Sequence, residues 1–209
     1  DVEKAFAPDY GININRLNIP VNPYDVFHCD VPNLSTSLYF VVNDSFYDKE
    51  LPKAHLPEGV YAGGLCRFAS EYPEIAARYY GKLAQTSENG VVALNTMLAQ
   101  DGFVVYVPKH TVVERPIQLV NIFRSDVDTM ANRRILFIVE ENAEARLLVC
   151  DHSIDDVKFF SNQVIEIFAG ANARADYYDL EESSVSTTRF SNLFVRQEAH
   201  SSVVVNGVT

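Results

Sequence analysis

The sequence predicts a mainly β protein: a parallel β-helix, in which the chain winds into stacked coils, preceded by a small α+β region. Two observations carry the prediction. Three segments, 137–149, 165–177 and 193–205, align at a constant offset of 28, from 137 to 165 to 193. Within each segment apolar and polar residues alternate, which is the period of a β-strand with one buried face.

The aligned segments show this alternation column by column. Alternate columns are apolar or small nearly throughout, such as the column of Ala143, Ala171 and Ala199. Asn142, Gly170 or Glu198 separates the two halves of each unit and predicts a bend there. A fixed period of ~20–50 residues is typical of a solenoid. The units lack both helical periodicity and the Leu and Asn ladder of leucine-rich repeats, so a parallel β-helix fits best.

One internal match conflicts with this offset. Phe160-Ser161-Asn162 resembles Phe190-Ser191-Asn192, which gives an offset of 30 (160 to 190). A bulge, or a loop of variable length between strands, would absorb the difference of two residues.

The region before the repeats, residues 1–102, mixes strands and helices. Residues 1–23 are mixed and polar and predict irregular chain. The β-rich run 38–44 ends in Asn-Asp-Ser, which indicates a strand followed by a turn, and a second short strand is expected at 60–64. We assign this part of the chain as the N-terminal α+β region.

Two helices are expected next. Ser70 offers an N-cap hydroxyl, and Ile75, Tyr79 and Leu83 follow at helical spacing, so the first helix should run to about 86–90. The second should cover 91–99 and close at Asp101-Gly102.

From Phe103 onward the texture is that of short strands, and residues 103–209 are assigned to the β-helix. Short strands are expected at 104–107, 112–113 and 117–122. The segment 107–113 resembles a first coil, offset by about 32 residues from Val139. The last repeat stops at Thr209 in mid-unit, so the solenoid is expected to be incomplete at its C-terminal end.

Composition excludes several functional classes. The net charge of −11 and the lack of Lys/Arg runs argue against nucleic-acid binding. No stretch approaches the ~18 apolar residues that a membrane span needs. The three cysteines, Cys29, Cys66 and Cys150, are widely spaced and odd in number, which favours reduced thiols and a cytoplasmic location over a disulfide framework.

Cysteine and histidine residues give the first candidate sites. In Cys150-Asp151-His152 the first and third residues share one face of a strand, and both could reach one soft metal ion. Repeat parity places Cys150 on the accessible outer face, where it could equally be an isolated surface residue. His28-Cys29-Asp30 has the same composition. Cys66 adjoins the cation of Arg67, but its apolar neighbours favour a buried, inert thiol.

Loop carboxylates give a second set of candidates. Paired acids on an outer face would suit a β-helix enzyme that cleaves polysaccharides, sometimes with bound calcium. Solvated surface carboxylates are the ordinary alternative. The candidates are Asp126, Asp128, Asp155, Asp156, Glu181 and Glu182. The sequence has no G-x-x-x-x-G-K-[ST] motif, so any ATP hydrolysis would belong to a partner.

A string of turn and strand residues resembles a known family. It runs through Leu94-Asn95, Asp101-Gly102-Phe103, Val107-Pro108-Lys109 and 112–117, and continues with 134–143. These residues are similar to the SufB/SufD family of the SUF iron–sulfur assembly system. Phe40-Val41-Val42-Asn43-Asp44 and Leu56-Pro57-Glu58-Gly59-Val60 are similar to the SufD branch.

The resemblance implies a right-handed β-helix and a scaffold role without catalysis. Its implied partners are a homologous SufB-like subunit and a SufC-like ABC-type ATPase, with a homodimer as a further possibility. The implied cargo is an iron–sulfur cluster held transiently in the assembled complex. No functional position of the family maps onto residues 1–209, so no catalytic, cofactor-binding or metal-binding residue is assigned. The alternative function is a secreted-type polysaccharide lyase or hydrolase.

Overall fold

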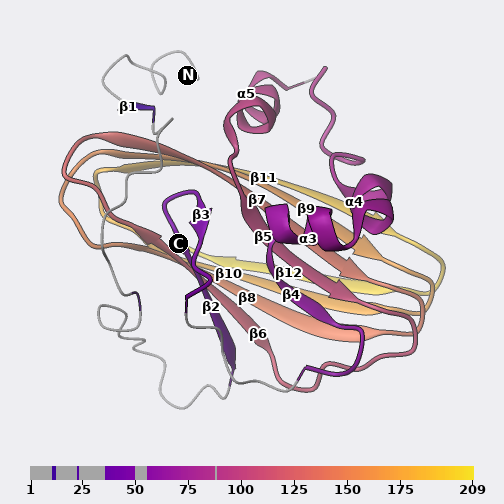
Figure 1. Ribbon diagram of the computed structural model, residues 1–209. Helices are drawn as coiled ribbons and strands as arrows, with labels where there is room; N and C mark the ends of the chain where they lie inside the picture. Colours follow the sequence, from indigo (N-terminus) through magenta and orange to yellow (C-terminus); the bar gives the residue numbers. More distant parts are fainter. Residues whose placement is uncertain (1–10, 13–22, 24–35, 50–55, 88) are drawn as a thin grey trace.

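The computed structural model describes residues 11–12, 23, 36–49, 56–87 and 89–209 (Figure 1). These residues form a parallel β-solenoid of about four turns, which confirms the expected fold class. Each coil contributes one strand to each of two parallel sheets. The first sheet holds β5 (Gly102–Val107), β7 (Thr129–Val139), β9 (Phe159–Ala169) and β11 (Thr187–Gln197). The second holds β6 (Ile117–Phe123), β8 (Glu144–Ser153), β10 (Arg174–Glu182) and β12 (Ser202–Val208).

The strand register corrects the predicted offset. Phe137 pairs with Ile167, an offset of 30, and Ile167 pairs with Val195, an offset of 28 (137 to 167 to 195). The constant offset of 28 is therefore wrong for the first step. The connection 154–158 between β8 and β9 is longer than the connection 183–186 between β10 and β11, and β10 is one residue shorter than β8. Both steps are even numbers, so every side chain keeps its face.

Two other expected alignments have different outcomes. Phe190 pairs with Asn162, so the match between the two Phe-Ser-Asn triplets does not reflect register. A loop of variable length is nevertheless the physical reason for the change of offset. Val107 pairs with Val139, which confirms the first coil and the offset expected for it (107 to 139).

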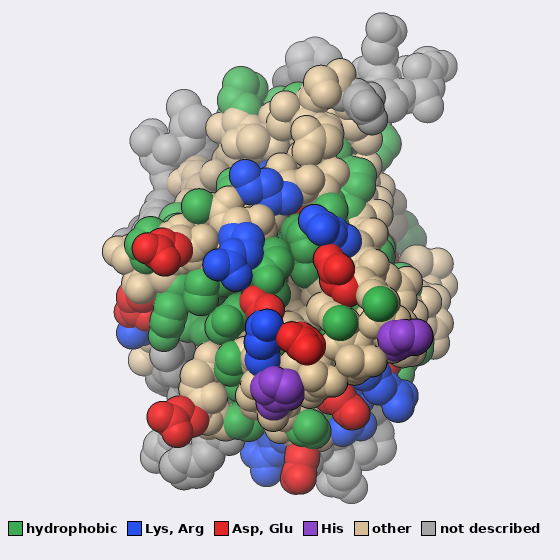
Figure 2. Space-filling model, turned by 90° about the vertical axis from the view of Figure 1, so that its right-hand side faces the viewer, with side chains coloured by type: hydrophobic (Ala, Val, Ile, Leu, Met, Phe, Trp, Pro, Cys, Tyr) green, Lys and Arg blue, Asp and Glu red, His purple; other side chains and the backbone are tan. Residues whose placement is uncertain are grey.

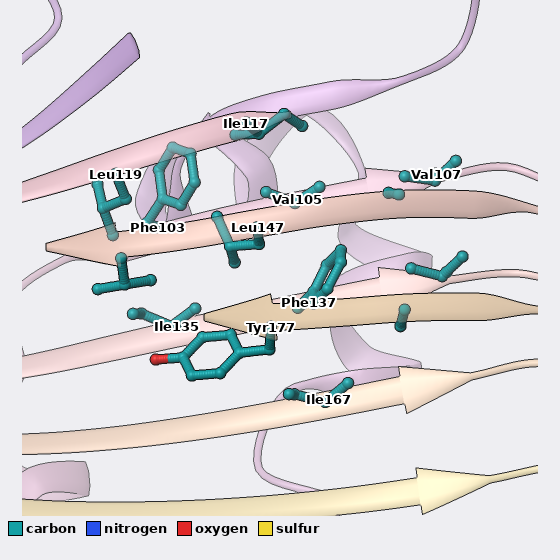
Figure 3. Close-up of a cluster of buried hydrophobic side chains, with 14 of the residues drawn as sticks. Phe103, Val105, Val107, Ile117, Leu119, Ile135, Phe137, Leu147, Ile167 and Tyr177 are labelled. Atoms are coloured by element: carbon teal, nitrogen blue, oxygen red, sulfur yellow. The ribbon is translucent and has the colours of Figure 1, made fainter. Parts of the chain in front are cut away.

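An apolar core fills one side of the space between the two sheets (Figure 3). Phe103, Phe137 and Ile167 from the first sheet meet Leu147 and Tyr177 from the second, and all five are almost fully buried. These residues occupy alternate positions of their strands, as the predicted period of two requires.

Short strands close the N-terminal end of this core. β2 (Ser37–Val42) pairs in parallel with β6, and β3 (Ser45–Phe46) folds back against β2. β4 (Tyr61–Gly64) pairs antiparallel with β5, and β1 (Gly11–Ile12) pairs with β7. The ring of Phe103 lies 5.3 Å from that of Tyr39 and 5.9 Å from that of Phe46, measured between centroids. The strands expected at 38–44 and 60–64 are thus confirmed.

Three helices cover the outer face of the first sheet (Figure 1). They are α3 (Leu65–Glu71), α4 (Pro73–Tyr79) and α5 (Gly90–Leu98). The expected N-cap at Ser70 is wrong, because Ser70 lies inside α3 and the chain breaks at Tyr72. Pro73 explains the break, since proline disfavours helical backbone in the preceding residue. The expected second helix is confirmed as α5, and the Asn89 side chain caps its first N–H groups.

The loop after α4 ends that helix earlier than expected. Glu166, a buried residue on the outer face of β9, accepts hydrogen bonds from the backbone N–H groups of Gly81, Leu83 and Ala84 at 2.9, 2.8 and 3.1 Å. A buried carboxylate needs such partners. The same contacts fix the loop on the sheet.

Tight turns join the two sheets at one end of each coil. His110, Asn142, Asn172 and His200 adopt positive φ angles of 54 to 60° at these turns. The sequence predicts the bends at Asn142, Gly170 and Glu198, and of these three residues only Asn142 has a positive φ angle. Gly170 has a different role, because a Cβ there would lie 2.6 Å from the backbone nitrogen of Glu141 in the neighbouring coil.

Candidate functional site

The structure corrects the expected accessibility of Cys150. Its side chain lies on the outer face of β8 but is only 3% exposed, among Phe40, Val120 and Ile122. The Gln118 amide donates a hydrogen bond to its sulfur at 3.6 Å. Side chains from β2 and β6 pack here, so the outer face of this sheet is not exposed to solvent at Cys150. Cys150 is a buried residue of a second apolar cluster.

The other members of this triplet have different surroundings. His152 Nδ1 lies 3.2 Å from a Glu182 carboxylate oxygen on the outer face. Asp151 points to the interior of the solenoid, where it contacts Arg133. Within the described part of the chain, no group of three or more His, Cys, Asp or Glu side chains is arranged to hold a metal ion.

The remaining cysteines divide into one that is described and one that is not. His28-Cys29-Asp30 lies outside the described residues. Cys66 is exposed, so the prediction of a buried thiol is wrong. It lies at the start of α3, and its thiol donates a hydrogen bond to the Gln100 carbonyl oxygen at 3.1 Å. Arg67 forms an ion pair with Glu71 at 2.7 Å.

The candidate carboxylates do not converge on one outer face. Asp128 accepts the Lys158 N–H at 3.0 Å, and Asp155 accepts the Ser125 N–H at 2.8 Å. Asp126 and Asp156 are exposed. The first two carboxylates link neighbouring loops instead of forming a cleft with paired acids.

A charged layer inside the solenoid is the feature that sequence reasoning missed. Arg189 of β11 points inward and contacts Asp151 at 3.0 Å, Asp179 at 2.6 Å and Glu181 at 3.0 Å. Together with Arg133, which is 3.3 Å from Asp151, these side chains form the interior charged layer. It joins β7 and β11 of the first sheet to β8 and β10 of the second. The layer therefore ties three successive coils together.

Burial sets the electrostatics of this layer. Arg133 is fully buried, and burial lowers the pKa of its guanidinium to about 10, although Asp151 and Asp44 oppose that shift. Its guanidinium carbon lies 3.9 Å from the centroid of the Phe123 ring, a cation–π contact. Burial also raises the pKa of Asp179. For Arg189, burial acts to lower the pKa, but the surrounding carboxylates prevail and raise it.

The alternation in the sequence could have identified this layer. Leu147 and Val149 face the core, so the next residue on that face of β8 is Asp151. The same count leads from Tyr177 to Asp179 and Glu181 on β10. Charged residues are rarely assigned to a buried face, because a buried charge is costly unless it is paired.

Two surface grooves flank α4. The larger, about 580 Å³, lies between α3, α4 and the segment 99–101 and includes Cys66, Ala77 and Tyr80. The smaller, about 270 Å³, lies between α4 and the turn ends of β7, β9 and β11 and includes Arg78, Glu140 and Arg196. Figure 2 shows an end of the molecule where hydrophobic side chains lie among Lys, Arg, Asp and Glu side chains. No helix among the described residues is long and apolar enough to cross a membrane.

Comparison with known proteins identifies the family. Residues 1–119 match the model of the SufBD protein N-terminal region, and residues 122–209 match that of the SufBD core domain of SUF system FeS cluster assembly. The chain is 28% identical over 169 residues to the chloroplastic protein ABCI7 of Arabidopsis thaliana, covering 77% of this chain and 35% of that protein. It is 25% identical over 167 residues to the iron–sulfur cluster assembly protein SufD of Bacillus subtilis, covering 78% and 38%.

A third relative is the SufBD family protein slr0074 of Synechocystis, with 31% identity over 122 residues, which covers 57% of this chain and 25% of the relative. The chain thus spans roughly a quarter to two fifths of the length of these relatives. The two family matches together run along almost all of it. With its parallel β-solenoid and these two matched regions, the chain belongs to the SufB/SufD family.

Proposed function

We propose that this chain is part of a non-catalytic scaffold subunit for iron–sulfur cluster assembly. The observation that carries the proposal is the match of residues 122–209 to the core domain of SUF system FeS cluster assembly. In this proposal the full-length protein pairs with a homologous SufB-like subunit and with a SufC-like ABC-type ATPase. The iron–sulfur cluster is the cargo of the assembled complex rather than a resident cofactor of this chain.

The fold supports a mechanical role. A scaffold must transmit movement of an ATPase without deforming, and coils joined by parallel hydrogen-bonded ladders resist such deformation. Here Arg189 adds cross-links through the interior, since its contacts with Asp151 and Asp179 connect strands of both sheets. The proposed role is to hold the partner subunit in place while ATP-driven movement exposes or assembles a nascent cluster. The proposed location is the cytoplasm.

The test is co-expression of the complete gene with the SufB-like and SufC-like proteins of its own organism. Affinity purification on the SufD-like chain should recover both partners in fixed stoichiometry. The matched control tags the SufC-like protein and omits this chain, which reports how much SufB-like protein the ATPase retains alone. If the full-length chain purifies alone or only as a homodimer, the proposed pairing is wrong.

A further inference from the structure

Next to the charged layer, several buried polar atoms of inward-facing side chains have no direct hydrogen-bond partner among the described residues. They come from both sheets, so neither sheet alone accounts for them. They include Asn121 Oδ1, Arg133 Nη2, Gln163 Nε2, Tyr177 OH and Asp179 Oδ1. An unpaired buried donor or acceptor destabilises the folded state, and native proteins pair nearly all such groups.

Asn121 and Gln163 show what kind of ligand would fit. The Asn121 amide nitrogen donates to Asp151 at 2.6 Å and toward the Gln163 amide oxygen at 3.4 Å, so the two side chains meet across the interior. Because Asp151 needs a donor, these bonds fix which way the Asn121 amide points. The remaining atoms are an acceptor on Asn121 and a donor on Gln163. A ligand between them must both donate and accept a hydrogen bond.

Tyr177 presents a third group to this space. Figure 3 shows its hydroxyl pointing toward the end of the core where Leu119 and Ile135 lie, and away from Ile167. Asn121 follows Leu119, and Arg133 precedes Ile135, by two residues on the same faces, so the hydroxyl points toward the polar side of the interior. Its side chain is fully buried. Burial, with the nearby carboxylates of Asp179 and Asp151, raises its pKa, so the hydroxyl stays protonated and is a donor.

We propose that the interior beside the charged layer is a hydration site, in which ordered water joins the Asn121 and Gln163 amides and the Tyr177 hydroxyl to the carboxylates. Water both donates and accepts, which neither a metal ion nor a simple anion does. Buried waters typically make about three hydrogen bonds to otherwise unpaired groups. Each of the three carboxylates already contacts a guanidinium group of Arg133 or Arg189, so none of them depends on a bound cation for a charged partner.

The direction in which one substitution changes the opening equilibrium of β10 tests this proposal. Tyr177→Phe in the full-length protein removes only the hydroxyl. If water bonds that hydroxyl, the variant loses a hydrogen bond, and the opening equilibrium of β10, measured by hydrogen exchange, should rise roughly two- to tenfold. A dry interior predicts the opposite, because the variant removes an unpaired buried group. A decrease or no change in opening therefore overturns the proposal.

A control variant and a crystal structure provide two further tests of the hydration site. Tyr79→Phe is the matched control, because that hydroxyl donates directly to Glu140 at 2.7 Å and its removal should increase local opening in either case. A high-resolution crystal structure of the full-length protein should show density within hydrogen-bonding distance of both Asn121 Oδ1 and Gln163 Nε2. Continuous protein packing with no density between these atoms would contradict a hydration site.

Discussion

Arg189 is the side chain on which the interior charged layer most depends, and replacing it by leucine tests that dependence. Its guanidinium is the shared partner of Asp151, Asp179 and Glu181. In Arg189→Leu, Asp151 keeps the Arg133 contact at 3.3 Å. Asp179 and Glu181 lose their cation while remaining largely shielded from water, with side chains 15% and 20% exposed.

The size of the effect follows from burial. Removing one partner of a buried ion pair costs roughly 3–5 kcal/mol, because the other charge is left uncompensated. The low end applies here, because the Arg189 side chain is 13% exposed and the two carboxylates that lose their cation are 15% and 20% exposed, while the fully buried Asp151 keeps Arg133. We therefore expect a loss of about 3 kcal/mol in the free energy of local opening. This corresponds to an increase on the order of 100-fold in the opening constant.

Hydrogen exchange of the full-length protein is the suitable assay, because it reports opening of β10 and β11 separately from the remaining chain. The control is Arg196→Leu, also in β11, which removes an exposed ion pair with Glu198 and should change the opening constant little. Equal exchange in the two variants would refute the reasoning, because it would mean that the interior contacts contribute no more than a surface pair.

Three other substitutions test separate contacts. Gly170→Ala places a Cβ 2.6 Å from the Glu141 nitrogen and should lower the free energy of unfolding by about 1–3 kcal/mol. Gly90→Ala is the control, because a Cβ there meets no other atom, and should be neutral or slightly stabilising; equal urea midpoints for the two variants would contradict the close contact at Gly170. Glu166→Gln puts an amide donor against one of the three backbone N–H groups that Glu166 accepts, so it should lower the free energy of unfolding by about 2 kcal/mol and speed hydrogen exchange of residues 81–84. Unchanged exchange would argue against a role of Glu166 in holding this loop. Burial raises the pKa of Asp179 above its ordinary 3.8, so just above pH 3.8 the folded state holds a proton that the unfolded chain has released, and the free energy of unfolding falls as pH rises. Asp179→Asn should make the slope of the unfolding free energy against pH more positive in this range, and an unchanged slope would contradict the raised pKa.

The alternation of apolar and polar residues was enough to predict the solenoid and its inner face. Side-chain direction in a strand depends only on the parity of position, so Phe137 and Leu147 could be assigned to the core from the sequence. The coil length could not be fixed in the same way. The offsets of 32, 30 and 28 found in the structure are all even and preserve the same parity, and the shorter connection 183–186 does not change the alternation within the strands.

Features that depend on packing between distant segments were not predictable. Cys150 faces outward, as parity requires, but Phe40 and Val120 pack beside it and bury it. The early end of α4 depends on Glu166, which lies far away along the chain. Asp151 was singled out only as a neighbour of Cys150, although its parity with Val149 places it inside.

The proposed scaffold role in iron–sulfur cluster assembly can be tested in cells. The most direct measurement is the activity of a cluster-dependent enzyme such as aconitase in host cells whose gene for this protein has been deleted and then restored. We expect deletion to lower the enzyme's activity without lowering its protein level, and the wild-type gene to restore that activity. Full activity in the deletion strain, with SUF as the only cluster-assembly system present, would show that the protein does not serve cluster assembly.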